Sequence, residues 1–213
     1  MAKPVILLVP PLFDEANRLR RTLVLTMRAL ASLGHPSILP DLPGQGDSLL
    51  PSEGASVVLW REALAQLASA DSAPLLVASW RGGALLDDAA INAIGWWRMA
   101  PQGGASIVKT MMRTRIAGDK EAGRQTSMDD LRAEAERGSV ELAGYALSGR
   151  MIAELEAAKP ADVSPLRQVS VGGSEGQVPG TALWLRAEPG EDRAMAAAMA
   201  ADISAWSLTC AAG

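Results

Sequence analysis

The sequence has few of the residues that carry common catalytic and metal chemistry. It contains one cysteine, Cys210, and one histidine, His35. A lone cysteine excludes a disulfide within the chain and suits a reducing compartment. No group of cysteine, histidine and acidic residues has the spacing of metal ligands, so we expect no metal site. No glycine-rich loop matches a phosphate-binding or dinucleotide-binding fingerprint, so we expect no cofactor.

The sequence also lacks an excess of basic residues and a long apolar run. A formal net charge of −4 and an isoelectric point of about 5.1 argue against a nucleic-acid partner. No stretch approaches the roughly 20 apolar residues that span a bilayer. Prolines interrupt the apolar N-terminal run and no cleavage site follows it, which argues against a secretory signal. We therefore expect a cytoplasmic protein without a transmembrane segment.

Apolar runs typical of buried strands alternate with helical patterns, which indicates an α/β fold with a doubly wound, mostly parallel sheet. Hydrophobic residues make up 48% of the 213 residues, and the simplest organisation is one domain over residues 1–213. We expect a six-stranded sheet in the order 2-1-3-4-5-6. The expected strands are residues 4–10, 36–41, 73–78, 91–99, 166–171 and 181–186, with a weaker one at 204–209, and the expected helices are residues 16–33, 56–69, 82–90 and 192–202.

The pattern changes over about residues 102–160, which contain helices and polar turns but no obvious strand. Ser127 and Asp130 have the spacing of a capping box at the start of one of these helices. Further along, residues 172–176 are expected to form a mobile loop. The segment 102–160 is therefore interpreted as a helical insertion in the sheet domain.

The turn after the third expected strand is the most informative local feature. Residues 79–83 read Ser-Trp-Arg-Gly-Gly, which is the layout of the α/β-hydrolase nucleophile elbow, where small residues flank a strained position that lifts one side chain above the sheet. The register Ser79-x-Arg81-x-Gly83 raises Arg81, and the neighbouring register, which raises Trp80, is also sterically allowed. Neither register places a nucleophile at the point of attack. The only histidine precedes the elbow, so the chain lacks the Ser-His-Asp order of this fold.

Arg81 has two interpretations that can coexist. At the start of a helix it can clamp an anionic ligand between its guanidinium and backbone amides. It can equally form an internal salt bridge with Glu15 or Asp14, because a buried arginine is usually paired. Glu15 can also activate a water molecule as a general base. His35 lies between a helix stop and a strand start, and we expect a structural histidine on the surface.

Four segments together resemble the exosortase A system-associated hydrolases. They are residues 10–21 with Pro-Pro and Glu-x-Asn, residues 39–48, residues 79–86 with arginine at the elbow, and residues 140–148. The resemblance extends over roughly residues 4–190. It implies the α/β-hydrolase fold, a short member without catalytic serine or histidine, and a lid formed by the insertion. It also implies a bacterial locus for exopolysaccharide production and protein sorting to the cell surface.

The order of a doubly wound sheet places the pocket at the C-terminal ends of the first and third strands, under the insertion. The expected ligand-binding residues are Leu12, Phe13, Glu15, Asn17, Trp80, Arg81 and Gly82. Of these, Arg81 and Glu15 are the candidates for a catalytic role.

The residues favour a degenerate member of the fold that binds a small anionic or acyl ligand at the elbow arginine without covalent catalysis. Two alternatives stay open. One is a non-serine hydrolase of esters or thioesters that uses a carboxylate-activated water, and the other is a non-catalytic protein-interaction module. The sequence does not decide whether the chain is an enzyme or forms homo-oligomers.

Overall fold

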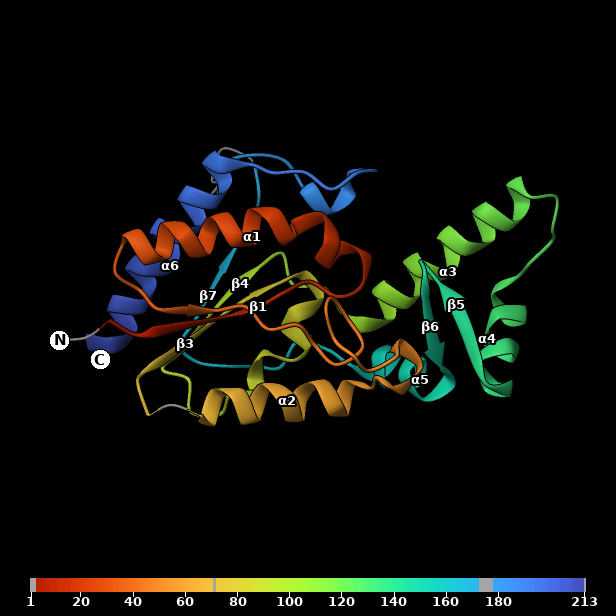
Figure 1. The fold of residues 1–213 in the computed structure, drawn as a ribbon, viewed down its shortest axis with the longest axis horizontal. Coiled ribbons are helices and arrows are strands. Elements are labelled where there is room, and N and C mark those ends of the chain that lie inside the picture. Colours follow the sequence, from red (N-terminus) through yellow and green to blue (C-terminus); the bar gives the residue numbers. More distant parts are fainter. Residues whose placement is uncertain (1–2, 71, 173–177, 213) are drawn as a thin grey trace.

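The fold is built on a parallel five-stranded sheet, seen in a computed structural model that describes residues 3–70, 72–172 and 178–212 (Figure 1). The strand order is β2-β1-β3-β4-β7. The strands are β1 Val5–Val9, β2 Ser37–Ile38, β3 Leu75–Trp80, β4 Gly95–Met99 and β7 Leu166–Val169. The sheet is parallel and its order reverses beside β1, as expected, but it has five strands rather than six.

Helices cover both faces of the sheet (Figure 1). Helices α1, Asp14–Ser32, and α6, Arg193–Ala212, pack together on one face, and α2, Val57–Ser69, covers the other. Side chains alternate along β1, so Ile6 and Leu8 join the core under α1 and α6 while Leu7 and Val9 join the core on the α2 side. The core on the α2 side continues without a break into the apolar residues of the 102–160 segment.

The 102–160 segment lies beyond the C-terminal ends of the strands (Figure 1). It contains α3 Gly104–Glu121, α4 Met128–Arg137, a hairpin of β5 Ser139–Leu142 and β6 Tyr145–Ser148, and α5 Gly149–Ala157. The capping box at Ser127 and Asp130 is confirmed. The expectation that no strand occurs here is wrong. Alternation of buried Val140 and Leu142 with exposed neighbours marks β5.

Three other expected elements differ. Residues 181–186 contain only a short 3-10 turn, η4 Leu183–Leu185, which contacts α1 without strand pairing and in which Leu183 and Trp184 are buried. Residues 204–209 lie inside α6, because no glycine or proline interrupts this alanine-rich stretch. The helix expected from residue 82 is replaced by two 3-10 turns, η2 Arg81–Leu85 and η3 Asp87–Ala89. A further 3-10 turn, η1, spans Ser52–Gly54. The expected loop at residues 172–176 falls outside the described residues except for Gly172.

Helix α6 is the one described helix long and apolar enough to cross a membrane, by length and composition only. A helix in a protein core meets the same criteria. Met195, Met199 and Ile203 of α6 are fully buried in the core that it shares with α1 and the sheet. The packing of α6 is therefore that of a core helix, with Asp192 as its N-cap, which accepts a hydrogen bond from the Met195 amide at 2.9 Å.

Candidate functional site

The turn after β3 has the strained geometry of a nucleophile elbow, and Arg81 occupies the raised position. Arg81 has a φ of 53°, a left-handed conformation that costs a non-glycine residue about 1 kcal/mol or more. Gly83 is required behind it, because a Cβ there would lie 2.5 Å from the Pro10 carbonyl oxygen. Trp80 is in extended conformation at the end of β3. The register that raises Arg81 is therefore the one that forms, and the register that raises Trp80 does not.

The Arg81 side chain is held by four hydrogen bonds. Its Nε and Nη2 donate to the two carboxylate oxygens of Glu15 at 3.1 and 3.2 Å. Its Nη2 also donates to Gln102 Oε1 at 2.6 Å, and its Nη1 donates to the Ala100 carbonyl at 3.1 Å. The guanidinium carbon lies 4.8 Å from the Trp184 ring centroid, in cation–π geometry. Arg81 thus joins the elbow to α1, to the loop after β4 and to η4 as an internal strut.

The start of α1 contributes a second strained residue. Phe13 precedes α1 with a φ of 56°. Its backbone amide donates to Gln45 Oε1 at 2.9 Å. Active α/β-hydrolases use an amide from the loop at this place as an oxyanion donor. In this chain the Phe13 amide is already bound by a side chain from the loop after β2.

A small pocket of ≈ 140 Å³ lies between the start of α1, α3 and η4, above the elbow. Most of its wall is apolar, from Leu12, Phe13, Ile107, Met111 and Trp184. Its polar groups are Asp14, Glu15, Arg18, Gln102, Thr110 and Thr114. The pocket is therefore an apolar slot with a polar rim. It lies beyond the end of β1, but none of its lining residues comes from the turn after β3, which was expected to form its other wall.

Three of the seven expected ligand-binding residues line the pocket, and the other four, Arg81 among them, do not. Leu12, Phe13 and Glu15 line the pocket. Gly82 packs below it, where a Cβ would lie 2.6 Å from Ile107 Cδ1. Asn17 faces a neighbouring cleft instead, because it lies on another side of the first turns of α1.

Trp80 is a clear correction, since it is completely buried under α6 and donates from Nε1 to Met199 Sδ at 3.2 Å. Sequence reasoning missed Arg18 and Trp184 as pocket residues. Arg18 is ion-paired with Asp14 and donates to the Trp184 carbonyl at 2.7 Å. The Glu-x-x-Arg spacing along α1 was the available signal for Arg18. No pattern in the sequence indicates that Trp184 lines the pocket, because residues 181–186 resemble a strand.

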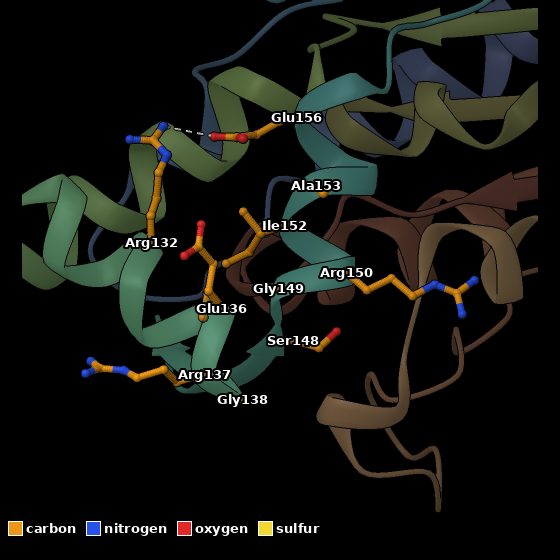
Figure 2. Close-up of a pocket in the computed structure, with 11 residues that line it drawn as sticks. Arg132, Glu136, Arg137, Gly138, Ser148, Gly149, Arg150, Ile152, Ala153 and Glu156 are labelled. Atoms are coloured by element: carbon orange, nitrogen blue, oxygen red, sulfur yellow. Dashed lines mark hydrogen bonds and ion pairs between the residues drawn. The ribbon is translucent and has the colours of Figure 1, made fainter.

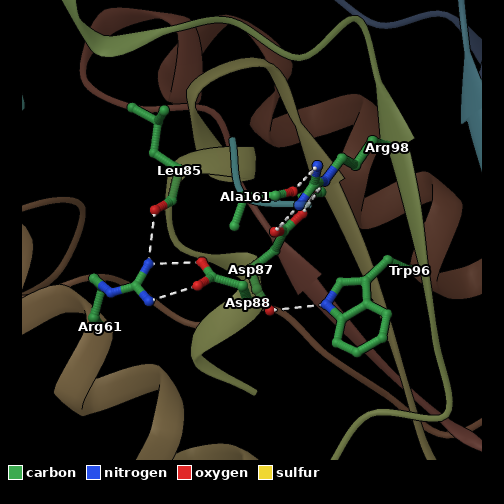
Figure 3. Close-up of polar contacts among 8 residues, drawn as sticks. Arg61, Leu85, Asp87, Asp88, Trp96, Arg98 and Ala161 are labelled. Carbon is green, nitrogen blue, oxygen red and sulfur yellow. Dashed lines mark hydrogen bonds and ion pairs between the residues drawn. The ribbon is translucent and has the colours of Figure 1, made fainter. Parts of the chain in front are cut away.

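Ser79, the hydroxyl residue closest to the elbow, is buried in a polar cluster below the turn. Its Oγ donates to Asp87 Oδ2 at 2.6 Å. Arg98 donates from Nε and Nη2 to both oxygens of Asp87 at 2.8 and 2.7 Å, and from Nη1 to the Ala161 carbonyl at 2.8 Å. Trp96 Nε1 donates to the Asp87 carbonyl at 3.1 Å (Figure 3). Ser79 is thereby fixed in the core, away from any point of attack.

The pKa values of the two adjacent aspartates, Asp87 and Asp88, shift in opposite directions. Burial raises the pKa of Asp87, while the hydrogen bonds from Arg98 and Ser79 oppose that rise. A hydrogen bond from Arg61 lowers the pKa of Asp88, which accepts from both Arg61 nitrogens at 2.6 and 2.7 Å (Figure 3). The turn that replaces the expected helix after the elbow is thus fixed by two arginine–aspartate pairs.

His35 is buried, which corrects the expectation of a surface histidine. Its Nδ1 lies 3.1 Å from the Pro4 carbonyl oxygen and its Nε2 lies 2.9 Å from Ser204 Oγ. A carbonyl oxygen only accepts, so Nδ1 donates to Pro4, and Nε2 forms a second hydrogen bond with the Ser204 hydroxyl, which can donate or accept. His35 lies at the start of β2, at the N-terminal end of the strands, and therefore joins β1 to α6 rather than serving the elbow.

A wider hollow of ≈ 570 Å³ lies between α4 and α5, away from the elbow (Figure 2). Arg132 reaches across it to Glu156, with 3.1 Å between Nη2 and Oε1. Arg137 and Arg150 point away from the hollow (Figure 2), and Arg150 pairs with Glu154 at 2.7 Å. Because its charged groups do not converge, this hollow is a weaker candidate for a binding site than the pocket between the start of α1, α3 and η4, which we call the elbow pocket. The described residues also contain no group of three His, Cys, Asp or Glu side chains placed to hold a metal ion.

Comparisons with known proteins identify the fold. No protein-family model and no curated protein sequence matches the chain. Among solved structures, the ferulic acid complex of Est1E from Butyrivibrio proteoclasticus aligns with a TM-score of 0.63 at 13% identity, over 99% of this chain and 90% of that chain. Alpha/beta hydrolase domain-containing protein 10 from mouse aligns with a TM-score of 0.53 at 18% identity, over 98% and 88% of the two chains. An extracellular alpha/beta-hydrolase from a Paenibacillus species aligns with a TM-score of 0.52 at 11% identity, over 94% and 97%. The chain has the α/β-hydrolase fold.

Proposed function

We propose that the protein binds a small acyl or aromatic carboxylic acid in the elbow pocket and does not perform serine-type hydrolysis. One observation carries this proposal. The position of the nucleophile is occupied by Arg81, and the Arg81 guanidinium is bound to Glu15, Gln102 and the Ala100 carbonyl. An elbow without a nucleophile and with an intact pocket above it favours binding over covalent chemistry.

The remaining groups do not compensate for the missing nucleophile. Ser79 is held by Asp87 in the core, and His35 lies at the other end of the strands. Both oxygens of Glu15 accept hydrogen bonds from Arg81, so this carboxylate is poorly placed to take a proton from water. These contacts favour a binding protein over a hydrolase that uses carboxylate-activated water.

The pocket lining supports the chemical class of the ligand. An apolar cavity of about 150 Å³ accommodates one benzene-sized molecule, and the elbow pocket measures ≈ 140 Å³. Arg18 lies at its rim and pairs with Asp14, whose side chain is 44% exposed. A ligand carboxylate would displace Asp14 from Arg18 at small cost, because Asp14 would then be hydrated. Arg18 rather than Arg81 is then the anion partner.

We further propose a role at bacterial loci for exopolysaccharide production and protein sorting to the surface. That setting is supported by the four segments that resemble exosortase A system-associated hydrolases. The structural neighbours share the fold at low identity and carry no information on this narrower association.

Isothermal titration with benzoate and hexanoate, whose apolar parts match a slot of ≈ 140 Å³, tests the binding role. Thr110 is exposed on α3 and lines the pocket. Thr110→Trp should fill the slot and abolish binding, whereas Lys109→Trp, at the adjacent exposed position outside the pocket lining, should bind like the wild type. The same protein should show no burst with p-nitrophenyl esters and no labelling by a fluorophosphonate. Stoichiometric labelling at Ser79, or binding that Thr110→Trp leaves intact, contradicts the proposal.

A further inference from the structure

A second cleft lies beside the elbow pocket, on another side of the first turns of α1. It has a volume of ≈ 300 Å³, within the about 300–1,000 Å³ of small-molecule sites. Its wall comes from α1, from the loop after β2 and from the hairpin of β5 and β6. Asn17, Gln45 and Tyr145 also line a more open hollow that adjoins it. The function proposed above uses none of these three side chains.

Gln45 carries the strongest sign of a ligand in this cleft. The residue is 7% exposed, and its Oε1 accepts from the Phe13 amide at 2.9 Å. Because the Phe13 N–H needs an acceptor, this hydrogen bond identifies the atom facing Phe13 as Oε1 and the other end of the side-chain amide as Nε2. Gln45 Nε2 is the one buried side-chain nitrogen or oxygen of the described residues that has no hydrogen-bond partner. A buried donor without an acceptor costs about 1–3 kcal/mol. Nε2 is covered in this structure, so a ligand oxygen that replaced the atoms covering it would relieve that cost.

The polar groups around Gln45 have mixed character. Asn17 lies at the rim and donates from its amide to Tyr145 Oη at 3.4 Å. Asp41 and Asp47 supply carboxylate acceptors, and Asp41 is oriented by Arg20, whose Nη1 donates to Asp41 Oδ1 at 2.6 Å. The cleft therefore presents amide donors and carboxylate acceptors side by side.

We infer that this cleft binds a carbohydrate through paired hydroxyl groups. A hydroxyl both donates and accepts, so two neighbouring hydroxyls can accept from an amide and donate to a carboxylate. The Tyr145 ring, which Phe13 holds edge-on at 5.3 Å between centroids, adds an aromatic wall for the apolar face of a sugar ring.

Other ligand classes fit the cleft less well. Arg20 is paired with Asp41, and Asp47 has no ion-pair partner among the described residues, so an uncompensated negative charge would repel an anion. In the elbow pocket, by contrast, Asp14 is paired with Arg18 and Glu15 with Arg81. A metal ion would find only two carboxylates, because the described residues place no group of three His, Cys, Asp or Glu side chains in this cleft. An apolar ligand would leave the amide and carboxylate groups without water or partners. A neutral polyhydroxylated ligand is the class that satisfies the donors and the acceptors together.

The experiment follows the Gln45 side-chain amide by NMR during titration with the methyl glycosides of glucose, galactose and mannose. Gln45→Glu keeps the oxygen that accepts from the Phe13 amide but removes the NH₂ group, so it assigns that pair of signals. The expected result is a saturable shift of the Gln45 NH₂ pair with at least one glycoside. Glycerol, which has hydroxyls but no ring, should bind more weakly.

Two surface variants keep the inference testable if Gln45→Glu does not fold. Asn17→Ala and Asp47→Ala alter exposed residues, and each should weaken glycoside binding about three- to tenfold through one lost hydrogen bond. Ser32→Ala, at the far end of α1, is the matched control and should bind like the wild type. Thr110→Trp should leave glycoside binding intact, which separates this cleft from the elbow pocket. An absence of any saturable shift with all three glycosides, or equal affinity in Asn17→Ala, overturns the inference.

Discussion

Replacing Arg81 tests whether the elbow arginine is an internal strut. Arg81→Ala removes four hydrogen bonds and the stacking on Trp184, and leaves Glu15 unpaired. Loss of one partner from a fully buried ion pair costs about 3–5 kcal/mol. The side chains of Arg81 and Glu15 are 15% and 25% exposed, so water screens part of that effect. We expect destabilisation by about 2–4 kcal/mol, with the lost cation–π contact included.

The backbone at Arg81 allows a sharper comparison. Arg81→Gly removes the same contacts but adopts the φ of 53° without strain. Arg81→Gly should therefore be more stable than Arg81→Ala by about 1 kcal/mol, although glycine is usually the more destabilising substitution. Arg28→Ala, at an exposed position of α1, serves as the control.

The measurement is urea unfolding of these variants together with a double-mutant cycle of Arg81→Ala and Glu15→Gln. A loss of about 3 kcal/mol corresponds to a fall in Tm of about 6–12 °C for a chain of this size. The cycle should give a coupling energy of about 1–3 kcal/mol. If each single change costs less than about 0.5 kcal/mol, as surface substitutions do, and the cycle shows no coupling, the strut interpretation is refuted.

Three other changes have definite expected outcomes. His35→Ala should cost about 1–3 kcal/mol in urea unfolding by leaving two buried partners unsatisfied, while ligand binding at the elbow stays unchanged; a cost near zero would contradict the buried placement. Arg98→Met should lower the free energy of unfolding by about 3–5 kcal/mol at neutral pH, because it leaves the Asp87 carboxylate buried without its partner. Burial raises the pKa of Asp87 above its unfolded value, so the stability difference between Arg98→Met and wild type should shrink as the pH falls and Asp87 becomes protonated. The hydrogen bond from Arg124 is the main cause that lowers the pKa of Asp119 to about 2. The ionised Asp119 carboxylate therefore stabilises the fold above its ordinary pKa of 3.8, and this stabilisation is lost as the pH falls through 2. The difference in Tm between wild type and Asp119→Asn should therefore narrow over that range, and a constant difference would exclude this assignment.

Local patterns in the sequence predict the sheet and the elbow well. The strands β1, β3 and β4 are short apolar runs bounded by turn residues. Helices α1 and α2 lie between β1 and β3, and two 3-10 turns lie between β3 and β4, and in both cases the chain returns to start the next strand parallel to the last. The elbow register was ambiguous between Trp80 and Arg81, because both have a small residue on either side. The structure resolves it through close packing, since Gly83 must lie against the end of β1. A salt bridge from Arg81 to Glu15 or Asp14 follows from the rule that a buried charge needs a partner, and the structure shows that the partner is Glu15.

Long-range packing explains what the sequence did not predict. Residues 204–209 look like a strand by local pattern, but the helix begun at Arg193 continues through them. Which cleft Asn17 faces depends on where the hairpin of β5 and β6 packs against α1, and no local pattern in the sequence predicts that position. The burial of His35 likewise depends on Ser204 of α6, which is 169 positions away in the chain. The elbow pocket was thus partly predictable, whereas the second cleft was not.

The continuous core under the 102–160 segment limits how the elbow pocket can open. Helix α3 buries Ile107, Val108, Met111 and Met112, and each such side chain contributes about 1.5–3 kcal/mol. Lifting α3 would therefore cost about 6–12 kcal/mol, which is comparable with the about 5–15 kcal/mol that holds a whole domain together. A state in which α3 has swung away from the pocket would therefore be populated about as rarely as the unfolded chain. Ligand exchange is cheaper past Leu185, which borders the pocket and is 76% exposed, because an exposed side chain changes rotamer within picoseconds to nanoseconds.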